Sequence, residues 1–152
     1  MPPRRLFRSL ALLEAVTWTL LLAGLLQKYA FDAGDWGVSV GGALHGFVFL
    51  AYAATAVLTA WNQRWNLATT AVAVVSAVVP YATIPVERWL DRSGRLVGGW
   101  RTESTEDPRD ARPLDRFVRW FLRRPAVLAA VLVAGVAVVF VVLLILGPPG
   151  GR

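Results

Sequence analysis

Four long apolar stretches dominate this chain, and each is separated from the next by polar or charged residues. They cover residues 10–26, 38–61, 67–84 and 126–146. The last contains no charged residue and no side chain able to form a hydrogen bond. About 20 apolar residues in a helix span the roughly 30 Å hydrocarbon layer of a bilayer. The pattern therefore predicts an all-α fold, a polytopic bundle of four transmembrane helices.

The spacing of the stretches predicts three parts. Residues 1–92 form a three-helix transmembrane unit, in which the short link 62–66 makes the second and third spans antiparallel neighbours. Residues 93–124 form an Arg-rich loop, and residues 125–152 form a fourth transmembrane helix, opened by Pro125, and a disordered tail. Segments 86–92 and 114–122 alternate apolar and charged residues with helical spacing. We expect amphipathic helices there, either on the membrane surface or continuing the adjoining spans, with 102–113 disordered or extended between them.

Composition supports a membrane protein and narrows the chemistry. Apolar residues make up 56% of the chain and charged residues 17%, against roughly 45–50% and 25% in soluble domains. The chain has no cysteine, so disulfides and thiolate sites are excluded, and one histidine rules out a multi-His metal site within one chain. No catalytic motif is present. We therefore expect neither an enzyme nor a bound cofactor.

The charge balance points to a lipid surface. The net charge is +6, and fifteen of the 16 basic residues are arginines that flank the apolar spans. This placement favours anionic lipid over nucleic acid as the partner. The arginines expected to meet lipid phosphates are Arg88, Arg92, Arg116, Arg119, Arg123 and Arg124.

The arginines also predict an orientation. The frequent Arg, Ala, Val and Leu fit a GC-rich bacterial genome, and for a bacterial chain with apolar spans we expect the plasma (inner) membrane. Basic residues in short loops stay cytoplasmic, and ten arginines lie in the loop 85–124. With four spans, both termini then lie outside, with 11 basic residues inside and five outside.

Polar side chains inside the spans are the candidate functional groups, because ionisable residues are costly in hydrocarbon. Glu14 lies about one turn inside the first span and His45 near the start of the second. Antiparallel geometry places Glu14 level with Tyr52 and Ser76, and His45 level with Thr83. Glu14 and His45 are then roughly 10 Å apart in depth, so no direct ion pair is expected.

Two interpretations of these groups stay open. They form a polar track for a proton, an ion or a lipid headgroup, or they form hydrogen bonds that hold the helices together. The second is favoured because the track is short and lacks a chain of carboxylates. Gly41, Gly42 and Gly46 predict a close helix approach, and the fourth span is expected to face lipid or a partner.

Several motifs in the first three spans resemble a known family. They are Glu14-Ala-Val-Thr-Trp, Lys28-Tyr29, His45-Gly46-Phe-Val-Phe-Leu-Ala-Tyr52, and Pro80-Tyr-Ala-Thr with Glu87-Arg88. Together they resemble domain of unknown function 3817, a family of small integral membrane proteins common in actinobacteria, over roughly residues 5 to 92. The resemblance implies a compact three-helix membrane unit and no known activity. Ala15 stands where the family usually has Gly, and Tyr81-Ala82 where it usually has Phe-Gly.

Two functional hypotheses follow. The first is a non-enzymatic accessory or scaffold subunit that packs against a membrane protein partner. The alternative is a small oligomeric transporter or channel-like protein that uses the intramembrane groups. The candidate residues are Glu14, Thr17, Lys28, His45, Gly46, Tyr52, Ser76 and Thr83.

Overall fold

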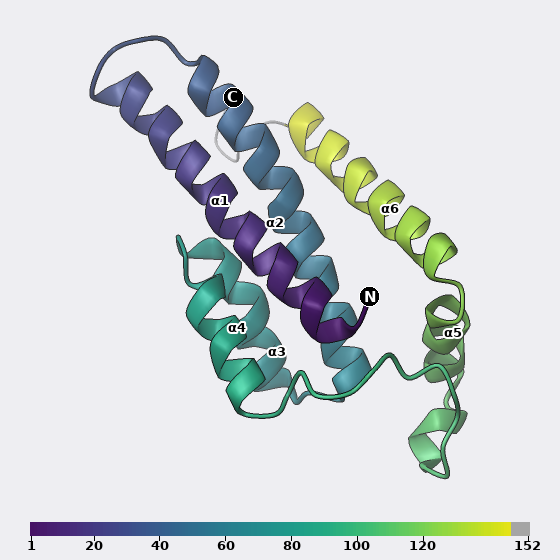
Figure 1. Ribbon diagram of the computed structural model, residues 1–152. Coiled ribbons are helices and arrows are strands. Elements are labelled where there is room, and N and C mark those ends of the chain that lie inside the picture. Colours follow the sequence, from purple (N-terminus) through teal and green to yellow (C-terminus); the bar gives the residue numbers. More distant parts are fainter. Residues whose placement is uncertain (147–152) are drawn as a thin grey trace.

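The computed structural model describes residues 1–146, so the predicted disordered tail 147–152 lies outside the described residues. The described part is built of helices and their connections (Figure 1). The elements are α1 (Pro3–Tyr29), α2 (Trp36–Gln63), α3 (Leu67–Val75), the 3₁₀ turn η1 (Ser76–Val78), α4 (Thr83–Arg92), the 3₁₀ turn η2 (Pro108–Ala111), α5 (Pro113–Leu122) and α6 (Pro125–Leu146). The predicted all-α helical bundle is confirmed.

Glycines allow α1 and α2 to pack closely as an antiparallel hairpin. A Cβ added to Gly41 would lie 2.9 Å from the carbonyl oxygen of Leu20, on the facing helix. Gly24 similarly faces the backbone of Gly37. Both glycine contacts bring backbone against backbone, which only a residue without a side chain allows. The predicted close helix approach is confirmed, and it sets the register of the hairpin.

The predicted third span, 67–84, is wrong as one continuous helix. Pro80 forces the residue before it out of the helical region, and Val79 is extended at φ −105° and ψ 125°. Tyr81 then takes a φ of +65°, which reverses the chain into α4. The helical stretch Leu67–Val78 is too short to cross a membrane at 1.5 Å per residue. The third apolar stretch therefore forms a helical hairpin with α4.

This α3–α4 hairpin packs against α1 and α2 and returns to the end of the bundle from which it starts. Figure 1 shows α3 and α4 beside the half of the bundle that holds the N-terminus. Thr83 at the hairpin tip donates to the carbonyl of Ala11, and Asp91 near the end of α4 accepts from Arg4 at 2.6 Å. The shared core is made by Phe7, Ala11, Tyr52, Ala56, Ala73, Ala77, Leu90 and Leu96.

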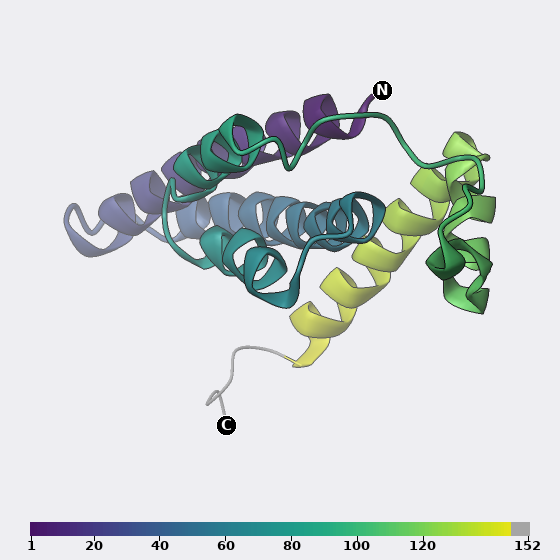
Figure 2. The same cartoon turned by 90° about the horizontal axis from the view of Figure 1, so that it is seen from below.

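Three helices, α1, α2 and α6, are long and apolar enough to cross a membrane. The predicted fourth span is confirmed as a helix that begins at Pro125. It runs alongside α2, where the rings of Phe47 and Phe140 lie 6.2 Å apart in a T-shaped arrangement (Figures 1 and 2). Val136 is the one buried residue of α6, so most of this helix presents an apolar surface outward.

The segment 93–124 is more ordered than its composition predicts. Asn62 at the end of α2 holds this segment through both polar atoms of its side chain. The side-chain nitrogen donates to the carbonyl of Gly99, and the side-chain oxygen accepts from the backbone N–H of Arg101. The stretch predicted as disordered or extended contains η2. Both predicted amphipathic helices form, and neither continues a span, because turns at 79–82 and 123–124 separate them from the preceding and following helices.

Candidate functional site

Glu14 of α1 and His45 of α2 meet inside the bundle. Oε1 of Glu14 lies 3.7 Å from Nδ1 of His45. Glu14 is completely buried and His45 is 9% exposed. The expectation that these groups lie about 10 Å apart in depth is therefore wrong.

The error comes from the register of the hairpin. The sequence estimate pairs Glu14 with Tyr52, whereas the glycine contacts pair Gly24 with Gly37 and Leu20 with Gly41. The residue numbers of facing pairs thus add to 61 and not 66, a difference of about five residues or 7.5 Å. The close contact of Gly24 with Gly37 sets this register, so the last turn of α1, which ends at Tyr29, extends beyond the start of α2 at Trp36.

Thr17 links the backbone of Glu14 to the ring of His45. Its hydroxyl donates to the carbonyl of Glu14 at 3.0 Å and lies 3.2 Å from Nδ1 of His45. Since the hydroxyl proton is used toward the carbonyl, Thr17 accepts from a proton on Nδ1. The ring of Trp18 lies 4.3 Å from that of His45, measured between centroids, and limits the rotation of the imidazole.

The carboxyl group of Glu14 is the least satisfied polar group of the cluster. Neither of its oxygens has a hydrogen-bond partner among the described residues. Buried polar groups are nearly always paired, and an exception needs an explanation. At 3.7 Å the carboxyl oxygen and the imidazole nitrogen are close enough for an electrostatic contact and too far apart for a hydrogen bond. In residues 1–146, no three His, Cys, Asp or Glu side chains are grouped to hold a metal ion.

The tip of the α3–α4 hairpin covers this cluster through hydrogen bonds to α1. The indole of Trp18 donates to the carbonyl of Ala77, and the hydroxyl of Thr19 lies 3.2 Å from that of Tyr81. Thr83 donates to Ala11 and does not contact His45 through a hydrogen bond, so their predicted pairing is wrong. Of the predicted polar track, the structure brings Glu14 and His45 together, with Thr17 beside them, and Tyr52, Ser76 and Thr83 bond elsewhere.

The remaining candidates lie elsewhere. The hydroxyls of Tyr52 and Ser76 are 3.1 Å apart, which confirms their predicted level. Ser76 also donates to the carbonyl of Ala73, so this pair is satisfied and links α2 to η1. Lys28 lies in the last turn of α1, with its ammonium 5.6 Å from the Tyr29 ring centre. Gly46 faces the ring of Phe140, where it allows α6 to approach α2.

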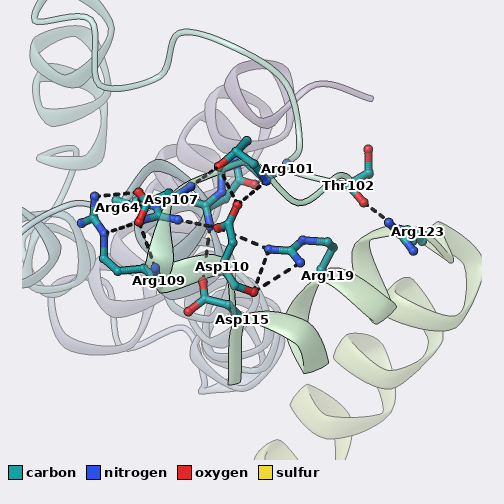
Figure 3. Close-up of polar contacts among 11 residues, drawn as sticks. Arg64, Arg101, Thr102, Asp107, Arg109, Asp110, Asp115, Arg119 and Arg123 are labelled. Carbon is teal, nitrogen blue, oxygen red and sulfur yellow. Dashed lines mark hydrogen bonds and ion pairs between the residues drawn. The ribbon is translucent and has the colours of Figure 1, made fainter. Parts of the chain in front are cut away.

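A second polar cluster holds the 93–124 segment together (Figure 3). Asp110 is buried, and its carboxyl accepts hydrogen bonds from Arg64 at 2.5 Å and from Arg101 at 3.2 Å. It also forms an ion pair with Arg119 at 3.2 Å, and Arg119 donates to its backbone carbonyl. Asp107 accepts from Arg64 at 2.5 Å and from Arg109 at 3.0 Å. Arg64 thus ties the end of α2 to both aspartates.

Hydrogen bonding sets the charge state of the aspartates. Donation from the backbone and side chain of Thr105 lowers the pKa of Asp110 below its ordinary value, and the arginines add to this. Donation from the Arg109 side chain lowers the pKa of Asp107 in the same way. Both carboxyls are therefore ionised at neutral pH, and they neutralise part of the arginine charge.

This network divides the arginines that were predicted to meet lipid phosphates. Arg119 is buried and bonded to Asp110, so it is committed to the fold. Arg123 donates to the carbonyl of Thr102, and Arg124 stacks over Trp120 at 4.3 Å. Arg88, Arg92 and Arg116 are exposed.

Sequence reasoning missed the residues that organise both clusters. Trp18 lies well inside the first apolar stretch, where no pattern marks it, and it contacts His45 and bonds to the hairpin tip. Asn62, Asp107 and Asp110 lie in stretches that the hydrophobic pattern predicts as loops. One feature of the sequence could have indicated the network: the acidic residues Asp107, Asp110 and Asp115 alternate with arginines in a segment that basic residues dominate.

The family comparison covers the α1–α4 unit that holds the intramembrane cluster. Residues 4–92 match the family described as Domain of unknown function (DUF3817). The chain belongs to the DUF3817 family. The family's description names no activity, and the match ends at α4, before the Arg–Asp network and α6.

A relative outside the family description adds the membrane setting. This chain is 41% identical over 105 residues to the protein named "Putative membrane protein SCO5905" of Streptomyces coelicolor. The match covers 68% of this chain but only 12% of the relative, so the chain spans a small part of that protein's length. No solved structure matches this chain significantly. Its apolar helices and this relative agree on an all-helical integral membrane protein.

Proposed function

We propose that this DUF3817 protein is a non-enzymatic accessory subunit of the bacterial plasma membrane, which packs against a membrane protein partner. The observation that carries the proposal is α6, an apolar helix of 22 residues with one buried residue. The family unit ends at residue 92, so α6 is an addition to it, and a helix that contacted only lipid would add no contact to that unit. The relative supports the same view, because there a matching segment is 12% of a much longer chain.

We also propose an orientation that differs from the expectation of both termini outside. The indole of Trp100 donates to the carbonyl of Met1 at 2.8 Å, and Arg4 pairs with Asp91. These contacts bring the N-terminus to the same end as the Arg–Asp network. Three crossings, by α1, α2 and α6, then put the N-terminus in the cytoplasm and the end of α6 outside.

The charge distribution supports this orientation. Three arginines in the first turns of α1, Arg64, and the ten arginines from Arg88 to Arg124 gather at one end, fourteen of the 16 basic residues. Lys28 is the one basic residue at the opposite end among the described residues. A four-span arrangement would strand five basic residues outside, so the hairpin improves agreement with the tendency of basic residues to stay inside.

Crosslinking in native membranes tests the accessory role. A photoreactive residue replaces Val138, which is 63% exposed on α6, and a matched control replaces the buried Val136. We expect Val138 to yield a discrete adduct with another membrane protein, while Val136 crosslinks within the chain to α2. Lipid adducts alone at Val138, together with a monodisperse monomer in mild detergent, would contradict the proposal.

The buried carboxyl favours a second candidate function, a small proton-coupled transporter that forms oligomers. Among residues 1–146, none donates a hydrogen bond to the Glu14 carboxyl, which lies 3.7 Å from His45, an arrangement that can bind and release a proton. The cluster is covered by the hairpin tip, so passage would need that tip to move. Structural pairing explains the other polar groups, which is why this function stands second.

A flux assay in liposomes separates the two candidates. The transporter hypothesis expects proton or ion flux that Glu14→Gln and His45→Ala abolish, while the distant Lys28→Gln leaves it unchanged. Absence of flux in the wild-type protein, or flux indifferent to both substitutions, removes the basis for transport.

A further inference from the structure

An apolar groove of about 620 Å³ runs between α2 and α6. Its α2 wall consists of Leu50, Ala53, Ala54, Val57, Leu58 and Trp61. Its α6 wall consists of Val131, Leu132, Gly135, Val136 and Val139, and Val118 of α5 closes the foot. Its volume lies within the roughly 300–1,000 Å³ of ordinary ligand sites.

The length of the groove matches one leaflet of a bilayer. Along α2 it extends from Leu50 to Trp61, about 16 Å at 1.5 Å per residue. Half of the hydrocarbon layer is about 15 Å. Beyond the groove, the ring of Phe140 packs against Phe47 and faces Gly46, which closes the deeper end. The small residues Ala53, Ala54 and Gly135 leave the space between the two walls unfilled.

A cationic pocket adjoins the mouth of the groove. This pocket of about 260 Å³ shares Val57 and Trp61 with it and adds Arg64, Arg109, Arg112 and Asp115. Arg64 and Arg109 bind Asp107, and Asp115 accepts from Arg101 at 3.3 Å. Arg112 is exposed, and its guanidinium has no acidic partner among the described residues. The pocket therefore presents one uncommitted positive charge beside an indole.

We propose that the α2–α6 groove binds an anionic phospholipid, with one acyl chain along the groove and the phosphate on Arg112. The proposal rests on the membrane setting of the proposed function, and it names a single binding site where that function requires only an anionic leaflet. Arginine is well suited to phosphate through paired N–H donors. Trp61 lies between the acyl chain and the phosphate, at the headgroup level of the membrane, where amphipathic rings prefer to lie.

Charge complementarity favours a phospholipid over a helix of a partner protein as the occupant of the groove. A partner helix would bring an apolar surface about 10 Å wide, and it would leave the guanidinium of Arg112 unpaired at its end. A lipid satisfies both ends of the site, because its chain covers the apolar walls and its phosphate pairs with the arginine.

The site can be tested on the purified full chain in mild detergent by native mass spectrometry. The probes are phosphatidylglycerol, phosphatidylcholine with the same chains, and inorganic phosphate. We expect one bound phosphatidylglycerol, preferred over phosphatidylcholine by about fivefold, which corresponds to about 1 kcal/mol per arginine near a lipid surface. Arg112→Gln removes this preference, and the exposed Arg116→Gln keeps it.

A second pair of variants tests the groove itself. A Cβ added to Gly135 meets nothing within 4 Å, so Gly135→Leu fills the groove without a backbone clash, and Ala134→Leu places the same side chain on the exposed neighbour. We expect Gly135→Leu to lose the lipid and Ala134→Leu to keep it. Equal lipid retention by both leucine variants would overturn the proposal. A dimer in the mass spectrum that is lost in Gly135→Leu would also overturn it, because a second copy of the chain would then occupy the groove.

The phosphate probe separates headgroup binding from a simple anion site. Inorganic phosphate that binds as tightly as phosphatidylglycerol, and is insensitive to Gly135→Leu, would overturn the assignment to a lipid. Loss of the lipid site leaves the accessory role intact, because crosslinking at Val138 reports on an exposed position of α6 that does not line the groove.

Discussion

Adding one methyl group to Gly41 should destabilise the bundle, whereas adding it to the next residue, Gly42, should not. A Cβ on Gly41 would lie 2.9 Å from the carbonyl oxygen of Leu20 and 3.0 Å from two further backbone atoms. A Cβ on Gly42 meets only the flexible end of Leu21, at 3.8 Å. Backbone atoms cannot rotate away, so Gly41→Ala must push α1 and α2 apart.

The magnitude follows from two opposing effects. Replacing glycine by alanine inside a helix stabilises it by roughly 0.5–1 kcal/mol, and both variants gain this. Overpacking costs typically 1–3 kcal/mol, and only Gly41→Ala incurs it. We therefore expect the two variants to differ by about 1–3 kcal/mol in unfolding free energy, with Gly42→Ala at or slightly above the wild-type value.

Unfolding in mixed micelles of dodecyl maltoside and dodecyl sulfate, followed by tryptophan fluorescence, measures this difference. The reasoning would be refuted if Gly42→Ala lost as much stability as Gly41→Ala, because the face of α2 toward α1 would then be a different one. The same register brings His45 beside Glu14, so that outcome would also remove the intramembrane cluster.

Two further predictions concern the hairpin and the Arg–Asp network. Thr83→Val removes the hydrogen bond to Ala11 at nearly constant shape and should cost about 0.6–2 kcal/mol in the same unfolding assay, more than Thr70→Val, whose hydroxyl bonds only within α3. Because the pKa of Asp110 is lowered in the fold, its stabilisation is complete above the ordinary carboxyl value of 3.8 and is lost as pH falls further. Hydrogen exchange of residues 102–112, corrected for the intrinsic rate, should show protection at pH 5 that disappears toward pH 2, and Asp110→Asn should lose it at pH 7. Protection unchanged by Asp110→Asn would contradict this role.

The elements with a long apolar pattern were predictable from the sequence. In α6, apolar residues alone fix the length of the helix, and Pro125 marks its start. In α1 and α2, the glycines indicate the close contact, although not which residues face each other. The register depends on which backbone atoms the glycines bring together, Gly24 with Gly37 and Gly41 with Leu20, and the midpoint of the connecting turn does not give it.

The third apolar stretch shows where hydropathy reasoning failed. Average hydropathy treats Pro80 as one residue in a window, whereas its effect on Val79 ends the helix. The amphipathic pattern of α4 was recognised as a helix. Its return along α1 depends on contacts distant in sequence, such as Arg4 with Asp91 and Thr83 with Ala11.

The candidate site was half predictable for a related reason. Burial in an apolar span identified Glu14 and His45 as unusual, and the positions of Tyr52 and Ser76 were correctly matched. Glu14 meets His45 because the observed register differs from the expected one by about five residues, a difference too small to detect from the hydrophobic pattern. The Arg–Asp network was hidden because pairing between charges in a polar segment leaves no periodic signal.

The central claim is that α3 and α4 form a hairpin that enters and leaves the bundle on one side, so the N-terminus and the Arg–Asp network share a compartment. The chain has no native cysteine, so single cysteines at Pro2, Ala33 and Ser104 can be labelled in intact cells with a membrane-impermeant maleimide. We predict labelling of Ala33→Cys alone before lysis, and of all three variants afterwards. Labelling of Pro2→Cys in intact cells while Ser104→Cys stays protected would contradict the account, because the third apolar stretch would then cross the membrane.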